Sequence, residues 1–211
     1  MARLSWGALA NRHYEIGVDR GVLYAPSQPG VAWSGLISIQ ESPTGGEPRP
    51  FYLDGIKYLN LASAEEFEAT IQAFSAPAEF RACEGIATVH LGLFAHQQPR
   101  VSFDFSYRTH VGNAVTGDEA GYKIHLVYGA LAAPSNRDNK SAGSSVDPAT
   151  YSWHISTLPP SVTGYKRTSH FVVDTRYADS GAVSDLEDVL YGTDVDSPEM
   201  PTPDELIAIF A

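Results

Sequence analysis

The chain has 211 residues, 25 of them acidic and 14 basic, and a formal charge of −11. This negative charge argues against a protein that grips nucleic acid, because phosphate binding depends on Lys and Arg displacing counterions. The single Cys83 excludes an internal disulfide, and we find neither an apolar run of transmembrane length nor a signal-peptide core, so we expect a soluble protein made in a reducing cytoplasm.

The N-terminal segment, residues 1–34, has no sustained hydrophobic period. Glycines and prolines interrupt it, and aromatic residues are scattered between them. Few such aromatics can pack within an isolated irregular segment, so we expect an arm that lies on its own sheet or on a neighbouring subunit. We place a β-rich domain at residues 35–180 and an acidic C-terminal extension at residues 181–211.

The clearest local prediction is a hairpin in FYLDGIKY, residues 51–58, after a strand at about residues 36–40. Asp54-Gly55 supplies the two positive-φ residues that a type I′ turn demands. The expected register brings apolar pairs onto one face, which is consistent with a real hairpin. The pairs are Leu53 with Ile56 and Phe51 with Tyr58.

One internal helix is predicted at residues 63–74 (SAEEFEATIQAF). Ser63 and Glu66 have the spacing of a capping box, which satisfies free backbone donors at a helix start. Three apolar residues, Phe67, Ile71 and Phe74, follow at helical spacing and predict a stripe that packs on the sheet.

Alternating apolar and polar residues predict most of the remaining strands. In residues 101–108, Phe103, Phe105 and Tyr107 alternate with polar residues that we expect on a wet face. Long polar loops are expected at residues 109–121 and 134–149. Loops of this length within a compact domain are usually functional. The predicted strands are residues 86–94, 101–108, 122–129, 151–158 and 169–176.

The C-terminal extension is expected to form two short helices, separated by an acidic, proline-containing linker. Ser184 with Glu187 predicts the first helix start, and Thr202, Pro203 and Glu205 predict the second.

No signature of catalysis or metal binding emerges. The chain lacks a Gly-rich phosphate loop followed by Lys, an H-E-x-x-H motif and a G-x-S-x-G elbow. Four of the seven histidines fall in predicted strands, where ordinary sheet histidines are the favoured interpretation. They are His90, His125, His154 and His170. We therefore predict no catalytic residues, no metal and no cofactor, and we expect that the chain is not an enzyme.

Several stretches together carry a resemblance over essentially the whole chain. They are YEIGVDRGVLY (14–24), FYLDGIKYLNLASAEEFEATIQAF (51–74), FSYRTHVGN (105–113), GYKIHLVYGALAAPS (121–135) and the C-terminal LEDVLYGTD…PTPDELIAIF. In these stretches the chain resembles the major tail protein, or tail tube protein, of long, non-contractile-tailed bacteriophages that infect actinobacteria.

This resemblance implies a mainly β fold, in which a two-sheet β-sandwich of the tail tube type is flanked by a helix and carries long loops. It also implies a virion protein, made in the bacterial host, of which six copies form a ring and the rings stack into a tube. Its partners would then be other copies of itself and the tape measure, terminator and distal tail proteins. Double-stranded DNA would pass through the lumen without sequence-specific binding.

Within this interpretation, we name Asp104 as a lumen-facing candidate, because a low-friction conduit should be poor in cations and in aromatic platforms. Arg108 and Lys123 depart from that ideal. The candidates for ring stacking, where opposite charges would fix register, lie in the N-terminal arm and the first long loop. They are Asp19, Arg20, Gly112, Asn113, Asp118 and Glu119.

Besides an enzyme of a type that no motif marks, two alternatives remain open. One is a tail component that forms a single ring, such as a terminator or distal tail protein, since a ring and a stack need the same lateral contacts. The other is a β-sandwich module that binds the host surface, which the numerous tyrosines would suit.

Overall fold

The computed structural model describes residues 7, 9, 12–139, 141 and 148–211. It is mainly β, with antiparallel sheets and a few short helices, as the sequence predicts, but no closed barrel forms in the described part of the chain. The main sheet has the strand order β2-β1-β11-β12-β13-β8-β3, and β14 also pairs with β12. Its strands are β1 (His13–Tyr24), β2 (Val31–Ala32), β3 (Leu36–Glu41), β8 (Glu68–Ala73), β11 (Phe103–Asn113), β12 (Gly117–Ala132), β13 (Tyr151–Thr157) and β14 (His170–Asp174).

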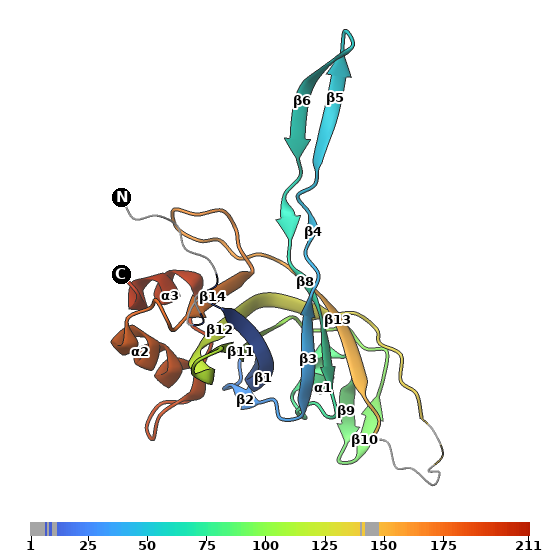
Figure 1. Cartoon of the computed structure of the whole chain (residues 1–211). Coiled ribbons are helices and arrows are strands. Elements are labelled where there is room, and N and C mark those ends of the chain that lie inside the picture. Colours follow the sequence, from blue (N-terminus) through green and yellow to red (C-terminus); the bar gives the residue numbers. More distant parts are fainter. Residues whose placement is uncertain (1–6, 8, 10–11, 140, 142–147) are drawn as a thin grey trace.

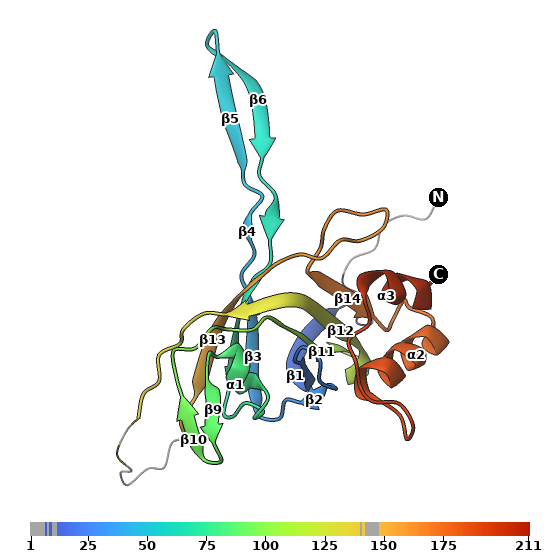
Figure 2. The ribbon, with the colours of Figure 1, turned by 180° about the vertical axis from the view of Figure 1, so that it is seen from behind.

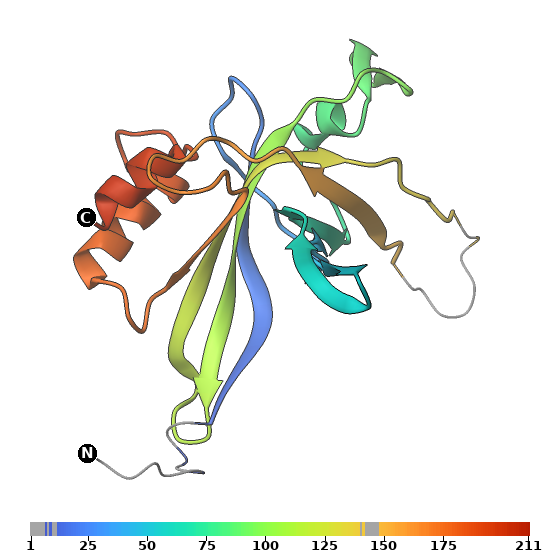
Figure 3. The same cartoon turned by 90° about the horizontal axis from the view of Figure 1, so that it is seen from above.

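The long strand β12 joins the two halves of this sheet. Its C-terminal residues pair with β13, while residues 123–127 pair with β14. Seen from above, one half (β1, β11, β12 and β14) and the other (β13, β8 and β3) diverge from β12 (Figure 3). Aromatic and aliphatic side chains fill the space between the halves, among them Phe103, Trp153 and Ile71. This main core also takes in α1 (Phe80–Cys83), whose Cys83 is a buried free thiol.

A second core lies on the other face of β1, β11 and β12, under the C-terminal helices α2 (Ser180–Tyr191) and α3 (Pro203–Ile209). Leu186 and Leu190 of α2 and Leu206 of α3 are buried there against Leu126. Figure 2 shows both helices against this half of the molecule. The prediction of a wet face on residues 101–108 is therefore wrong: Ser106 is 1% exposed, because the C-terminal helices cover this face.

A long two-stranded ribbon projects from the body (Figure 1). We call residues 44–66 the arm; it contains β4 (Thr44–Gly45), β5 (Pro48–Leu53), β6 (Ile56–Ala62) and β7 (Glu65–Glu66). Its tip confirms the predicted turn, with φ values of 52° at Asp54 and 76° at Gly55 and with Leu53 paired to Ile56. A register shift beyond the turn pairs Phe51 with Leu59 rather than with Tyr58. A smaller hairpin, β9 (Ala87–His90) and β10 (Leu93–Ala95), replaces the single strand predicted at residues 86–94.

The helix predicted at residues 63–74 is wrong. Residues 65–66 form β7 and residues 68–73 form β8, a central strand between β13 and β3. Ala69, Ile71 and Ala73 are fully buried and alternate with half-buried polar residues, so the period of two prevails. Burial against two neighbouring strands overrides a local preference for helix, which is worth only tenths of a kcal/mol per residue.

Two segments that were predicted to be irregular are strands. Residues 13–24, in the expected N-terminal arm, form β1, whose register shifts twice along β11 and so hides the alternation. Most of the loop predicted at residues 109–121 belongs to β11 and β12, and only residues 114–116 form the turn. The Asn113 side chain accepts hydrogen bonds from the backbone N–H groups of Val115 and Thr116 and so holds this turn.

The C-terminal helices were predicted correctly, but only one helix start was. Thr202 and Glu205 form the expected capping box of α3. The first helix starts instead after Asp179, whose side chain accepts hydrogen bonds from the N–H groups of Gly181 and Ala182. Ser184 and Glu187 therefore lie inside α2. In the described residues, no helix is long and apolar enough to cross a membrane.

Candidate functional site

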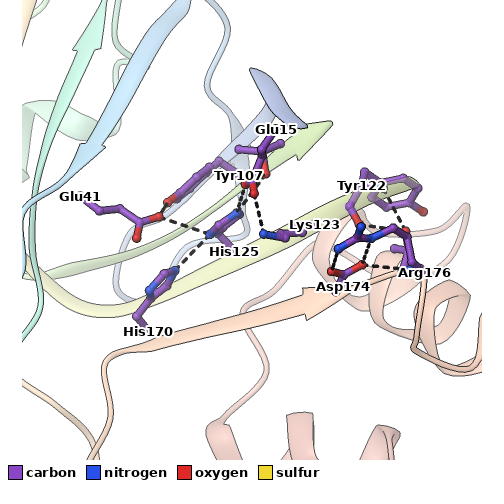
Figure 4. Close-up of polar contacts among 11 residues, drawn as sticks. Glu15, Glu41, Tyr107, Tyr122, Lys123, His125, His170, Asp174 and Arg176 are labelled. Atoms are coloured by element: carbon purple, nitrogen blue, oxygen red, sulfur yellow. Dashed lines mark hydrogen bonds and ion pairs between the residues drawn. The ribbon is translucent and has the colours of Figure 1, made fainter. Parts of the chain in front are cut away.

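A polar network lies where β1, β3, β11, β12 and β14 approach one another (Figure 4). His125 of β12 is at its centre. Its Nδ1 atom lies 3.2 Å from Nε2 of His170, on β14, and 3.5 Å from Oε1 of Glu41, the last residue of β3. Its Nε2 atom lies 3.1 Å from the hydroxyl of Thr109, on β11.

The pairing of the strands explains why these side chains meet. His125 lies opposite Val172 in the β12–β14 ladder, and His170 lies opposite Val127. The two histidines are therefore diagonal neighbours on one face of the sheet, a distance that large side chains can span. On the other side of β12, Tyr107 lies directly opposite His125, and the two rings are parallel with centroids 4.5 Å apart.

Burial keeps both imidazoles neutral. Removal from water, followed by the repulsion between two protonated rings that His170 would cause, lowers the pKa of His125 to about 4. Burial also lowers the pKa of His170, although the Glu41 carboxylate opposes this. Neutral imidazoles each keep one nitrogen lone pair, which a proton or a metal ion can use.

The groups around the histidines are tied to one another. The Tyr107 hydroxyl donates a hydrogen bond of 2.7 Å to Oε1 of Glu41, and burial and this carboxylate raise the pKa of Tyr107. Thr109 donates a hydrogen bond of 2.6 Å to Oε1 of Glu15, and Lys123 pairs with the other oxygen of Glu15. Although burial acts to raise the pKa of Glu15, these contacts lower it. The Glu15 carboxylate is therefore ionised at neutral pH.

This geometry fits the binding of a cation better than catalysis. Glu41, His125 and His170 each offer one ligand atom, and these atoms lie within 4.8 Å of one another. They form the one such group of His, Cys, Asp or Glu residues in the described part of the chain. The only cysteine, Cys83, lies elsewhere, and burial raises the pKa of its thiol to about 11, as expected of a packed side chain.

The sequence did not reveal this group. The prediction was that no metal is bound and that His90, His125, His154 and His170 could converge in space but are better interpreted as ordinary sheet histidines. Two of the four come together, but they are 45 positions apart in the chain, and the third group, Glu41, comes from a strand at the edge of the sheet. The period-two pattern placed both histidines on strands, which was the one usable signal.

Two of the predicted ring-stacking residues make contacts within the chain. Asp19 accepts hydrogen bonds from Arg108 and lies 2.9 Å from Nε2 of His110. These bonds, those of Arg108 first, lower the pKa of Asp19 to about 2 in spite of partial burial. Arg20 is exposed and lies 3.9 Å from Glu187 of α2. A role for either in stacking stays a prediction.

The other four stacking candidates lie at or near one turn. Gly112 is buried, and a Cβ atom there would come within 2.4 Å of the Gly117 carbonyl oxygen. Asn113 is 8% exposed. Asp118 and Glu119, by contrast, are exposed at the start of β12, so they alone among the four present charge to the outside.

Asp104, the lumen-facing candidate, accepts a hydrogen bond of 2.6 Å from the N–H group of Gly129. Burial raises the pKa of this carboxyl, and the hydrogen bond from Gly129 opposes the rise. The carboxylate is therefore engaged within the chain, and its exposure to a lumen stays a prediction.

Comparison with known proteins gives weak similarities. No family model and no curated protein matches the chain. Among solved structures, a chain of the six-fold symmetrised baseplate of the anti-feeding prophage superposes with a TM-score of 0.40 and 8% identity, over 81% of this chain and 97% of that one. The tube-terminating cap of the same particle gives a TM-score of 0.36 and 12% identity, over 74% and 88% of the two chains.

A third structure belongs to the sheath–tube complex of an extracellular contractile injection system in its extended state. It gives a TM-score of 0.36 and 14% identity, over 82% of this chain and 99% of that one. The three neighbours are thus parts of a prophage baseplate, of a prophage tube cap and of a contractile injection system. At these scores the similarity is too low to assign a function.

Proposed function

We propose that this chain is a non-catalytic structural subunit of a phage tail tube. Six copies form a ring, and stacked rings form the conduit through which double-stranded DNA passes from the capsid to the host. The tape measure, terminator and distal tail proteins are its other partners. The resemblance of nearly the whole sequence to major tail proteins supports this proposal.

The arm is the observation that carries the proposal. Every residue of β5 and β6 is exposed, and an isolated two-stranded hairpin is at best marginally stable in water. Seven large apolar side chains nevertheless project from it into solvent: Phe51, Tyr52, Leu53, Ile56, Tyr58, Leu59 and Leu61. Exposed apolar surface of this kind is typical of an interaction site, and a second copy of this chain, in the next ring, is the occupant we propose.

The sheet also has open edges. In the described residues the order of strands runs from β2 to β3 without returning on itself. Unpaired edges invite uncontrolled pairing, and a ring that joins sheets from neighbouring copies removes them. Pairing of β3 with a strand of the neighbouring copy would therefore close the ring, while the arm would contact the next ring in the stack.

The outward face of β3, β8 and β13 is our candidate for the lumen wall. Cross-strand pairs on this face join Ser152 with Gln72 and His154 with Thr70. Within the described strands β3, β8 and β13, this face carries no Lys or Arg and no Phe, Tyr or Trp, which suits a bore that DNA must pass without sticking. The polar residues concerned are Ser38, Gln40, Glu68, Thr70, Gln72, Ser152, His154 and Ser156.

A component that forms a single ring is the second candidate, because it would need the same lateral contacts. The arm favours the tube, since its exposed apolar side chains need a surface to cover them, and the next ring in a stack would supply one. A module that binds the host surface would instead persist as a monomer.

Electron microscopy of the purified protein tests the proposal. We expect tubes of stacked rings for the natural sequence. We expect single rings for Ile56→Asp, because a charge at the exposed arm tip opposes an apolar contact. Val195→Asp is the matched control, since Val195 is also exposed but lies in the linker between α2 and α3. Monomers of the natural sequence at high concentration, or normal tubes of Ile56→Asp, would contradict the proposal.

A further inference from the structure

We propose that Glu41, His125 and His170 bind one zinc ion, which ties the end of β3, at the base of the arm, to β12 and β14. This inference does not depend on assembly into a tube.

Two of the three distances between the ligand atoms already suit zinc, and all three atoms lie within 4.8 Å of one another. Tetrahedral zinc with ligand bonds near 2.0–2.1 Å places neighbouring ligand atoms about 3.3 Å apart. Nδ1 of His125 lies 3.2 Å from Nε2 of His170 and 3.5 Å from Oε1 of Glu41. Two imidazoles and one carboxylate form a ligand set that zinc accepts, with a fourth position for water.

Hydrogen bonds fix the tautomer of His125. The Thr109 hydroxyl has one proton, and it donates this proton to the Glu15 carboxylate at 2.6 Å. Towards Nε2 of His125, at 3.1 Å, the hydroxyl oxygen must therefore accept. His125 thus carries its proton on Nε2, and its Nδ1 lone pair points towards the other two ligands. Such an outer hydrogen bond to a ligand histidine is a regular feature of metal sites.

The other two ligands are also held in place. Tyr107 donates to the Glu41 carboxylate, and its ring lies parallel to the ring of His125. His170 packs against Phe67, with ring centroids 4.4 Å apart. The planes of the two imidazoles differ by only 14°. Without a metal, the N–H group at Nε2 of His170 therefore donates a hydrogen bond to Nδ1 of His125. Zinc would replace this hydrogen bond once the proton of His170 has moved from Nε2 to Nδ1 of the same ring. The His170 ring would then tilt so that the lone pair of its Nε2 atom faces the ion.

The position of the site gives it a structural consequence. Glu41 ends β3 just before the arm begins, and Phe67 follows the last strand of the arm. In the order of strands, β13 and β8 lie between the edge strand β3 and the pair β12 and β14. An ion held by Glu41, His125 and His170 would therefore tie β3 directly to β12 and β14. The side chain of Glu41 is 39% exposed, which leaves a route for the ion.

Zinc titration of the full-length, untagged, chelator-treated protein tests the site by calorimetry. We expect one zinc per chain and, at a hundredfold excess over the Kd, a rise in Tm of about 5 °C or more. Cobalt substitution should give the visible absorption of a tetrahedral site. Glu41→Gln and His170→Gln should each weaken binding at least tenfold. Thr109→Val, which removes the hydroxyl beside His125, should weaken it about 10- to 100-fold.

His154→Gln is the matched control. His154 also lies on a strand of the main sheet beside a carboxylate, at 3.4 Å from Glu68, but it is outside the proposed site, so its loss should leave zinc binding unchanged. Because Glu41 is partly exposed, we expect Glu41→Gln to fold. Loss of zinc binding in this variant would therefore report on the site rather than on unfolding. Absence of zinc binding, or equal affinity in Glu41→Gln, His170→Gln and His154→Gln, would overturn the proposal.

Discussion

Asp19 and Arg108 lie opposite each other on β1 and β11, and the guanidinium donates two hydrogen bonds, of 2.8 and 2.7 Å, to the two carboxylate oxygens. The Arg108 side chain is 12% exposed and lies over the ring of Tyr122. This fork-to-fork pair joins the N-terminal strand to the centre of the sheet. Paired charges of this kind are stronger and more directional than single contacts.

Removal of the Asp19 carboxylate should destabilise the protein, because Arg108 would keep its charge at a mostly buried position without this partner. We expect Asp19→Ala to lower the free energy of unfolding by about 1–3 kcal/mol, as measured by urea denaturation. Arg20→Ala, at the neighbouring but exposed position, should stay within about 0.5 kcal/mol of the natural sequence. Equal effects of the two variants would show that the pair adds no stability.

The same pair should make stability depend on acid. Because the hydrogen bonds from Arg108 lower the pKa of Asp19 to about 2, against an unfolded value of about 3.9, the folded state favours the ionised carboxylate. Its contribution is complete above the unfolded pKa and is lost as the pH falls from about 4 towards 2. Denaturation at a series of pH values should show a shallower acid slope for Asp19→Asn. Asp118→Asn, at the exposed start of β12, serves as the control and should keep the slope of the natural sequence.

The contribution of β8 to the main core can be tested directly. Ile71 is fully buried, so Ile71→Ala should cost about 2–5 kcal/mol of unfolding free energy. Ile56→Ala removes the same atoms from a residue that is 64% exposed on the arm and should cost far less in the free chain. Thr70→Pro should also be strongly destabilising, because a central strand needs its backbone N–H group for the ladder.

Local signals predicted the local features of this fold and little beyond them. The Asp54-Gly55 turn and the Thr202–Glu205 capping box depend on a few adjacent residues, and both are present. The segment 63–74 carries equally good local signs of a helix, yet it forms a strand, because its neighbours in β13 lie about 80 positions away. No pattern within residues 63–74 indicates that they pair with β13.

The candidate site was hidden for the same reason. His125 and His170 meet only because β12 pairs with β14 in one particular register. Glu41 joins them only because the two halves of the sheet pack across the main core. A period of two indicates which face of a strand a histidine occupies, but not which distant strand shares that face.

The turn between β11 and β12 offers a test of ring stacking that leaves the fold intact. Deletion of the turn would remove the buried Asn113, which holds the chain reversal, so a change confined to charge is cleaner. We expect Asp118→Lys with Glu119→Lys to shorten the tubes seen by electron microscopy, because reversed charges would repel the partner that the natural carboxylates attract. The thermal unfolding temperature should not change, since both side chains are exposed. Asp185→Lys with Asp188→Lys, at two exposed positions of α2, makes the same change in net charge elsewhere and is the matched control. Tubes of normal length from the turn variant, or equally short tubes from both variants, would exclude a specific role for this turn in stacking.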